Sequence, residues 1–125
     1  MKPMVLTVPA KAEWNMVLRM AAAGVGAVYD LPVDVVEDLN TAIEESCELL
    51  VHQDYAAETL TLQCEEKPDG LHVSLTAQER KSQKEDEPAD ADIARLIIQT
   101  LVKDVCIDRD ENGVHGVHMT LPAGV

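Results

Sequence analysis

The most informative stretch of this chain runs Glu37-Asp-Leu-Asn-Thr-Ala-Ile-Glu-Glu-Ser-Cys-Glu-Leu-Leu-Val-His-Gln-Asp-Tyr55. Its apolar residues recur every three or four positions, which is the spacing of one buried helix face. Pro32 and several acidic residues stand at its start, where negative charge complements the helix dipole. The pattern predicts an amphipathic helix that begins near Pro32 and packs on a core. The expected buried stripe consists of Val36, Leu39, Ile43, Cys47 and Leu50.

The segments on either side predict a sheet covered by helices. Alternating apolar and polar residues indicate strands, and two such runs joined by Lys67-Pro-Asp-Gly70 indicate a hairpin. The charged run 77–91 has no apolar periodicity and predicts a mobile loop. The order β-α-α-β-β-loop-α-β-β predicts an α+β two-layer sandwich, with a mixed, mostly antiparallel sheet and helices on one face, as a single domain over residues 1–125. Strands are expected at 4–8, 58–65, 71–76, 105–108 and 114–121, and the other helices at 10–28 and 93–102.

Composition narrows the classes of function. Of the 125 residues, 46% are apolar but only 2% are aromatic, so the core must be built from aliphatic side chains. The formal charge of −13 repels nucleic acid and anionic membranes, so no nucleic acid and no membrane is expected as a partner. A basic protein partner suits this charge, and so does a solvated acidic surface that serves solubility alone.

The cysteines and the N-terminus favour a cytoplasmic protein. Cys47, Cys64 and Cys106 are widely spaced, odd in number and form no CxxC pair, which is typical of reduced, buried thiols. The first residues lack the apolar run of a signal peptide, and no stretch approaches the ~20 apolar residues that span a bilayer. A soluble cytoplasmic location is therefore expected.

Other side chains give weaker signals. His115 and His118 would point to opposite faces of a strand, so they do not indicate a metal pair, and no metal site is predicted. Trp14, the only tryptophan, is expected to pack in the core between the first helix and the sheet. No Ser-His-Asp or Cys-His nucleophile can be assigned from spacing alone.

Two stretches resemble one protein family. Leu6-Thr-Val-Pro-Ala-Lys-Ala12 and the run from Glu37 to Cys47 resemble the anti-sigma-factor serine kinases of the GHKL superfamily. The resemblance implies the histidine-kinase-like ATPase fold, ATP and Mg²⁺ as cofactors, a homodimer, and a sigma factor or anti-anti-sigma factor as partner. It also implies that Glu45 corresponds to the catalytic glutamate and that Arg19 corresponds to an arginine that contacts the partner.

Each motif that holds the nucleotide in that family is altered here. Leu49 stands where the family has a magnesium-binding asparagine, and it has no lone pair to offer. The Asp-x-Gly-x-Gly motif is replaced by Leu75-Thr-Ala-Gln-Glu-Arg-Lys-Ser82, and the glycines of the phosphate lid by Ala89-Asp-Ala-Asp-Ile-Ala-Arg95. Phosphate loops need glycine for positive φ angles and open backbone N–H groups. The binding of ATP and Mg²⁺ is therefore predicted to be lost, which leaves Glu45 as a vestigial catalytic candidate and no cofactor-binding residue.

Two functions follow from the resemblance. The first is a regulatory protein that binds a sigma factor or an anti-anti-sigma partner, with Arg19 as the candidate contact. The alternative is an active ATP-dependent serine protein kinase and anti-sigma factor in which Glu45 is the catalytic base. Fold analogy does not decide between them, because function resides in sites rather than in folds.

Overall fold

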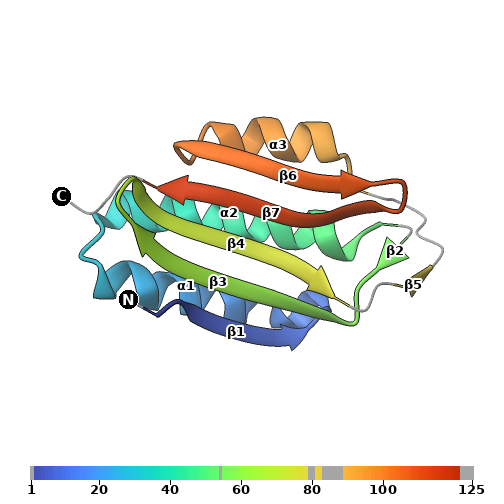
Figure 1. Cartoon of the computed structure of the whole chain (residues 1–125), viewed down its shortest axis with the longest axis horizontal. Coiled ribbons are helices and arrows are strands. Elements are labelled where there is room, and N and C mark those ends of the chain that lie inside the picture. The colour runs from blue at the N-terminus through green and yellow to red at the C-terminus, as the bar shows by residue number, and fades with distance from the viewer. Residues whose placement is uncertain (1, 54, 79–80, 83–88, 122–125) are drawn as a thin grey trace.

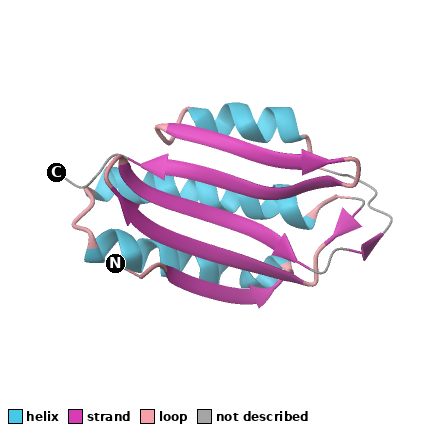
Figure 2. Ribbon diagram, in the orientation of Figure 1, coloured by secondary structure: helices cyan, strands magenta, loops and turns pink. Residues whose placement is uncertain are grey.

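The computed structural model describes residues 2–53, 55–78, 81–82 and 89–121, which form two layers (Figure 1). One layer is a five-stranded sheet in the order β1-β3-β4-β7-β6, and each neighbouring pair is antiparallel. The α-helices of the described residues all cover the same face of this sheet (Figure 2). The predicted α+β two-layer sandwich is therefore confirmed. The elements are β1 (Met4–Pro9), the 3-10 turn η1 (Ala12–Trp14), α1 (Asn15–Val28), α2 (Val33–Val51), β2 (Tyr55–Ala56), β3 (Thr59–Lys67), β4 (Gly70–Gln78), β5 (Lys81–Ser82), α3 (Ala91–Gln99), β6 (Asp104–Asp110) and β7 (Gly113–Leu121).

The inner face of α2 lies at the centre of the core. Leu39, Ile43, Cys47 and Leu50 have no exposed surface and Val36 is half-buried, so the predicted stripe is confirmed. Strands β3, β4 and β7 turn alternate residues toward the helices, as expected for a sheet covered on one face. The opposite face is polar and open. The buried strand residues are Leu60, Leu62, Cys64, Leu71, Val73, Leu75, Val117, Met119 and Leu121.

The first helix begins later than predicted, and the prediction that Trp14 packs in the core is wrong. Trp14 ends the 3-10 turn and is 37% exposed. Trp14 is expected on the buried side of the first helix, but the buried face starts one residue later, about 100° around the helix. The residues buried on α1 are Asn15, Leu18, Ala22, Val25 and Gly26.

The predicted loop over residues 77–91 is partly wrong. Ala77 and Gln78 continue β4, β5 pairs with β2, and Ala91 already belongs to α3. Polar residues can extend β4 because its outer face meets solvent, where the side-chain oxygen of Gln78 accepts a hydrogen bond from the hydroxyl of Thr61 at 2.8 Å. Residues 79–80 and 83–88 lie outside the described part of the chain, so mobility there stays a prediction.

Two of the three cysteines are buried thiols, as predicted. Burial raises the pKa of Cys47 from 9.0 to about 12 and the pKa of Cys64 from 9.0 to about 11, so both are neutral at physiological pH. Cys106 is exposed on the edge strand β6, and the expectation of burial is wrong for this residue. No helix in the described residues is both long and apolar enough to cross a membrane.

Helices α1 and α2 approach each other closely at Gly26. A Cβ atom on Gly26 would lie 2.8 Å from Cγ2 of Val36 on α2, which is shorter than a nonbonded carbon contact. Gly24 lies on the same helix, and a Cβ atom there would meet nothing within 4 Å. Gly26 therefore permits the helix contact, whereas Gly24 plays no part in it.

Alanine substitutions at these two glycines should have opposite effects. Gly26→Ala should lower the free energy of unfolding by about 1–3 kcal/mol, because the added methyl group forces α1 and α2 apart. Gly24→Ala should raise it by about 0.5–1 kcal/mol, because alanine loses less backbone entropy in an exposed helix. Urea unfolding followed by circular dichroism measures both values. Equal changes at the two positions would contradict the packing role of Gly26.

Candidate functional site

A cavity of about 390 Å³ lies between the end of α2, the start of α3 and the turn that joins β6 to β7. Figure 1 shows these elements meeting at one end of the molecule. The family resemblance implies a nucleotide beside α2 and the start of α3, which are the helices that border this cavity. The residues that shape it include Leu49, Gln53, Ala91, Glu111 and Val114.

Leu49 forms the apolar wall of the cavity. It is 2% exposed and belongs to the hydrophobic core. Its methyl groups cannot coordinate a cation, which requires oxygen ligands in the case of Mg²⁺. Glu45 lies one turn earlier on α2, is half-buried, and is not among the described residues that line the cavity. Its role as a catalytic base stays a prediction.

Gln53 closes the inner end of the cavity by joining α2 to β7. It is 7% exposed. Its Nε2 donates to the carbonyl oxygen of Val114 at 2.6 Å, and its Oε1 accepts from the backbone N–H of Val114 at 2.9 Å. Sequence analysis missed this residue. The available signal was its position three residues after Leu50, which continues the buried spacing of α2.

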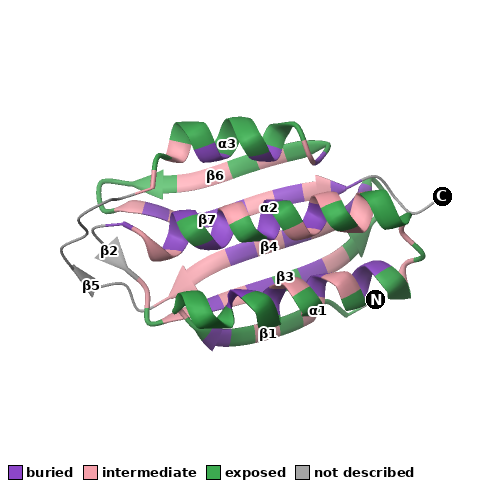
Figure 3. Cartoon of the chain, turned by 180° about the vertical axis from the view of Figure 1, so that it is seen from behind, coloured by how far each residue is buried: buried purple, intermediate pink, exposed green. Residues whose placement is uncertain are grey.

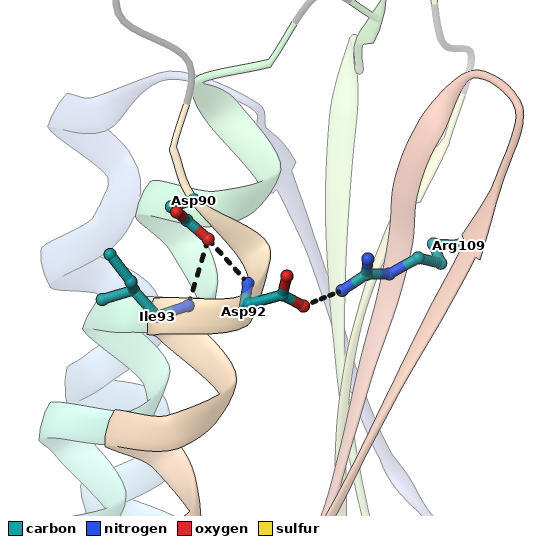
Figure 4. Close-up of polar contacts among 4 residues, drawn as sticks. All are labelled: Asp90, Asp92, Ile93 and Arg109. Atoms are coloured by element: carbon teal, nitrogen blue, oxygen red, sulfur yellow. Dashed lines mark hydrogen bonds and ion pairs between the residues drawn. The ribbon is translucent and has the colours of Figure 1, made fainter.

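The start of α3 is occupied by a carboxylate of the chain itself (Figure 4). Oδ1 of Asp90 accepts from the backbone N–H groups of Asp92 at 2.9 Å and Ile93 at 3.2 Å. Asp92 reaches across to β6, where its Oδ1 is 3.3 Å from Nη2 of Arg109. Free N–H groups at a helix start are the usual donors to a bound phosphate. A phosphate here would have to displace Asp90 and approach a second carboxylate.

Arg19 lies in the seam between α1 and α2. Its Nη1 is 3.9 Å from Oε2 of Glu44, and its side chain is 37% exposed. Its Nε atom is buried without a hydrogen-bond partner, as are the Oδ1 atoms of Asn15 and Asn40. Unpaired buried polar atoms raise the free energy of the folded state. The unpaired Nε is therefore inaccessible to a partner, whereas the exposed part of the guanidinium makes only the long contact to Glu44.

The open face of the sheet carries a hydrogen-bonded chain that spacing did not reveal. His118 contacts Oδ2 of Asp108 through Nε2 at 2.6 Å, and Oγ of Ser74 through Nδ1 at 2.9 Å. The three residue types match a Ser-His-Asp triad, but Ser74 lies mid-strand in β4, which pairs on both sides. The backbone N–H groups beside it belong to the sheet ladder and cannot stabilise an oxyanion. The geometry indicates a structural link across β4, β7 and β6.

The remaining polar groups of this face do not assemble a metal centre. Within the described residues, no group of three or more His, Cys, Asp or Glu side chains is arranged to hold a metal ion. A second cavity of about 300 Å³ lies beside His118 and is also lined by His72. His72 hydrogen-bonds Asp69 at 2.7 Å, and this bond holds the pKa of Asp69 below its ordinary value.

Comparison with known proteins identifies the fold. No protein-family model matches this chain, and no curated protein matches it. Matches are found among solved structures, including the crystal structure of the RsbU and RsbW domains of Rv1364c from Mycobacterium tuberculosis. That match covers 98% of this chain and 32% of the other, at 17% sequence identity and a TM-score of 0.75. This chain thus spans about a third of its neighbour's length, and the two share a fold over that part.

Replacing Gln53 tests whether it secures the end of α2. Gln53→Leu should lower the free energy of unfolding by about 2–3 kcal/mol, because the buried N–H and carbonyl of Val114 both lose their partner. Urea unfolding measures the change. Gln63→Leu, at an exposed position on β3, is the matched control and should shift stability by less than about 0.5 kcal/mol. Unchanged stability of Gln53→Leu would show that the two hydrogen bonds contribute nothing.

Proposed function

We propose that this chain is an anti-sigma-factor-type regulatory protein that acts by binding a partner protein and transfers no phosphate. The proposal rests above all on the cavity between α2 and α3, whose wall is the buried side chain of Leu49 in place of an oxygen ligand. The match to a structure that contains an RsbW domain supports the regulator class. Because fold alone does not establish function, the sequence resemblance over residues 6–55 is the second support.

The proposal includes the loss of ATP and Mg²⁺ as cofactors. Leu49 offers no oxygen to a cation, and Asp90 occupies the N–H groups at the start of α3. Asp110 and Glu111 add two carboxylates to the cavity on the side of the β6–β7 turn. Carboxylates at this place repel a triphosphate whose charge no metal ion neutralises.

The proposed partner is a sigma factor or an anti-anti-sigma factor, contacted in part by Arg19. The side chain of Arg19 is partly exposed, and its contact with Glu44 is long, at 3.9 Å between Nη1 and Oε2. An exposed guanidinium can bind a partner carboxylate through two parallel hydrogen bonds. A homodimer and a cytoplasmic location also belong to the proposal, the first on the family resemblance and the second on composition.

The alternative function is an active ATP-dependent serine protein kinase. The position of Glu45 favours it, because this half-buried carboxylate lies one helical turn before Leu49, the residue of α2 that lines the cavity. A carboxylate so placed can act as a general base toward a serine hydroxyl. ATP would then have to be held by groups other than the family motifs, so nucleotide binding separates the two functions.

Titration calorimetry with Mg-ATP and Mg-ADP should detect no binding up to millimolar nucleotide. Leu49→Asn restores the amide of the family motif, yet it should still bind no nucleotide, because Asp90 and the acidic turn remain. It should also lower the free energy of unfolding by about 2–4 kcal/mol, since a polar group replaces a core leucine. Thr41→Asn, at an exposed site on the same helix, controls for the substitution. Micromolar binding by the unaltered chain would contradict the proposal and favour the kinase.

Partner binding is tested with purified sigma factors and anti-anti-sigma factors from the source cell. The chain should form a complex with one of them in the absence of nucleotide, as measured by size-exclusion chromatography and calorimetry. Arg19→Ala should weaken that complex about tenfold or more, through the loss of charge-assisted hydrogen bonds. Lys67→Ala, at the exposed end of β3, should leave the affinity unchanged. A complex that requires Mg-ATP, or phosphate transfer to the partner, would support the kinase instead.

A further inference from the structure

Large apolar side chains lie exposed on the outer face of α3. Ile93 is 56% exposed, Leu96 is 64% exposed and Ile97 is 36% exposed. The residues that this helix buries are Ala94 and Ile98. An isolated surface helix normally turns its larger apolar residues inward. This helix therefore has a second apolar face, which no residue in the described part of the chain covers.

Two of the three exposed apolar side chains of α3, Ile93 and Ile97, lie on the flank away from β6, whereas Leu96 follows Asp92 by four residues and lies between that flank and β6. Asp92 contacts Arg109 of β6, which places that strand on one flank of the helix (Figure 4). Ile93 follows about 100° further around the helix and points away from β6 in the same view. Ile97 lies one turn after Ile93 on the same side. Because α3 packs against α2 and contacts β6 on its other flank, we place this side next to the outer surface of α2. Figure 3 shows the two helices on the same face of the sheet.

The outer surface of α2 is acidic, and few basic groups of the described residues lie near its carboxylates. Of the acidic residues on this helix, Glu44 is near Arg19 and Glu48 is near His52. No ion pair to the other four is present among the described residues. Its six acidic residues are Asp34, Glu37, Asp38, Glu44, Glu45 and Glu48, and the helix has no Lys or Arg.

Two of these carboxylates lie on the edge of α2 that faces α3. Leu49 marks that edge, because it lines the cavity together with Ala91 at the start of α3. Glu45 precedes Leu49 by four residues and Asp38 precedes it by eleven, and both spacings return to the same side of a helix. Both side chains are partly exposed. An acidic edge therefore runs beside the apolar face of α3.

We infer that the α2–α3 surface, formed by Asp38, Glu45, Ile93, Leu96 and Ile97, binds an amphipathic helix of another protein in which Lys or Arg flanks the apolar face. Apolar residues of that helix would cover α3, and its cations would pair with the acidic edge of α2. The 19 residues of α2 extend about 28 Å, so a partner helix of about five turns matches its length. The inference deepens the proposed function. It rests on that function in one respect, namely that the partner is a protein.

Charge complementarity selects this occupant over others. Nucleic acid and anionic membrane would meet a surface of their own sign. A second copy of the chain would bring another −13 charge. Its helices also lack the required basic flanks. Helix α1 contains one basic residue of the Lys or Arg type, Arg19, and α3 contains one, Arg95. A basic helix of a different protein is the occupant that satisfies both the apolar and the acidic part of the surface.

The test uses a model peptide of about 18 residues with leucines on one face and lysines on its borders, a length close to that of α2. A second peptide has glutamate in place of each lysine. Calorimetry with the full chain should give micromolar affinity for the lysine peptide, and about 100-fold weaker binding for the glutamate peptide, because like charges repel. Equal affinity for the two peptides would overturn the inference.

Paired variants locate the binding surface. Ile93→Ser combined with Leu96→Ser should lower the affinity for the lysine peptide about tenfold or more, because the apolar contact is lost. The control, Met16→Ser with Met20→Ser, removes two exposed apolar residues of α1 and should leave the affinity unchanged. Both pairs replace exposed side chains, and circular dichroism checks that the fold is kept. Equal weakening by the two pairs would show that the peptide does not bind at α3.

A second comparison separates local charge from net charge. Asp38→Asn with Glu45→Gln should lower the affinity for the lysine peptide about tenfold and reduce the dependence of that affinity on salt. Glu65→Gln with Glu66→Gln on β3 removes the same total charge and should have little effect. Equal effects would overturn the inference.

The outcome also distinguishes this inference from the proposed function. The chain carrying Ile93→Ser with Leu96→Ser is mixed with a sigma factor or an anti-anti-sigma factor. If the complex still forms, the α2–α3 binding surface is wrong and the proposed regulatory function stands. If the lysine peptide binds at the α2–α3 surface but neither class of factor forms a complex, the binding surface is supported and the proposed regulatory function is wrong.

Discussion

The burial of α2 against the middle of the sheet is the constraint on which the other elements depend. Leu39, Ile43 and Leu50 pack over β4 and β7, while α1 and α3 pack on either side of α2. Because the chain has no Phe and its tryptophan is exposed, aliphatic side chains must fill this space by interlocking. The close contact at Gly26 follows from the same requirement. The position of α2 therefore sets where α3 stands and which acidic residues lie beside it.

The end of α2 also determines what the neighbouring cavity can hold. Leu49 extends the core to the cavity wall, where burial of a leucine side chain contributes about 2 kcal/mol. Gln53 then satisfies both backbone groups of Val114, and each such bond contributes about 1 kcal/mol. Groups that stabilise the fold thus line the cavity at the position where the family resemblance leads us to expect an oxygen ligand for a metal. This is the physical argument that favours partner binding over phosphate transfer.

Local patterns in the sequence predicted most of the fold and little of the polar geometry. The stripe from Val36 to Leu50 and the strand alternation were sufficient for the two layers, because burial repeats with the period of each element. Contacts such as Gln53 with Val114 and His118 with Ser74 depend on how β7 aligns with distant segments. A shift in strand register between Asp108 and Arg109 changes how β6 aligns with β7, and no local pattern indicates it. The prediction that Trp14 is buried was wrong for a related reason, because the short 3-10 turn shifts the buried face of the helix by one residue.

The acidic charge of this chain acts on its exposed apolar surface in two ways. An uncovered stripe such as Ile93, Leu96 and Ile97 would favour self-association in a neutral protein. Repulsion between chains of −13 charge opposes that association, while the same carboxylates attract a basic helix. Screening at physiological salt confines these effects to about 8 Å, so the residues beside α3 matter more than the total charge. The apolar contact then supplies most of the affinity, and Asp38 and Glu45 supply the choice of partner.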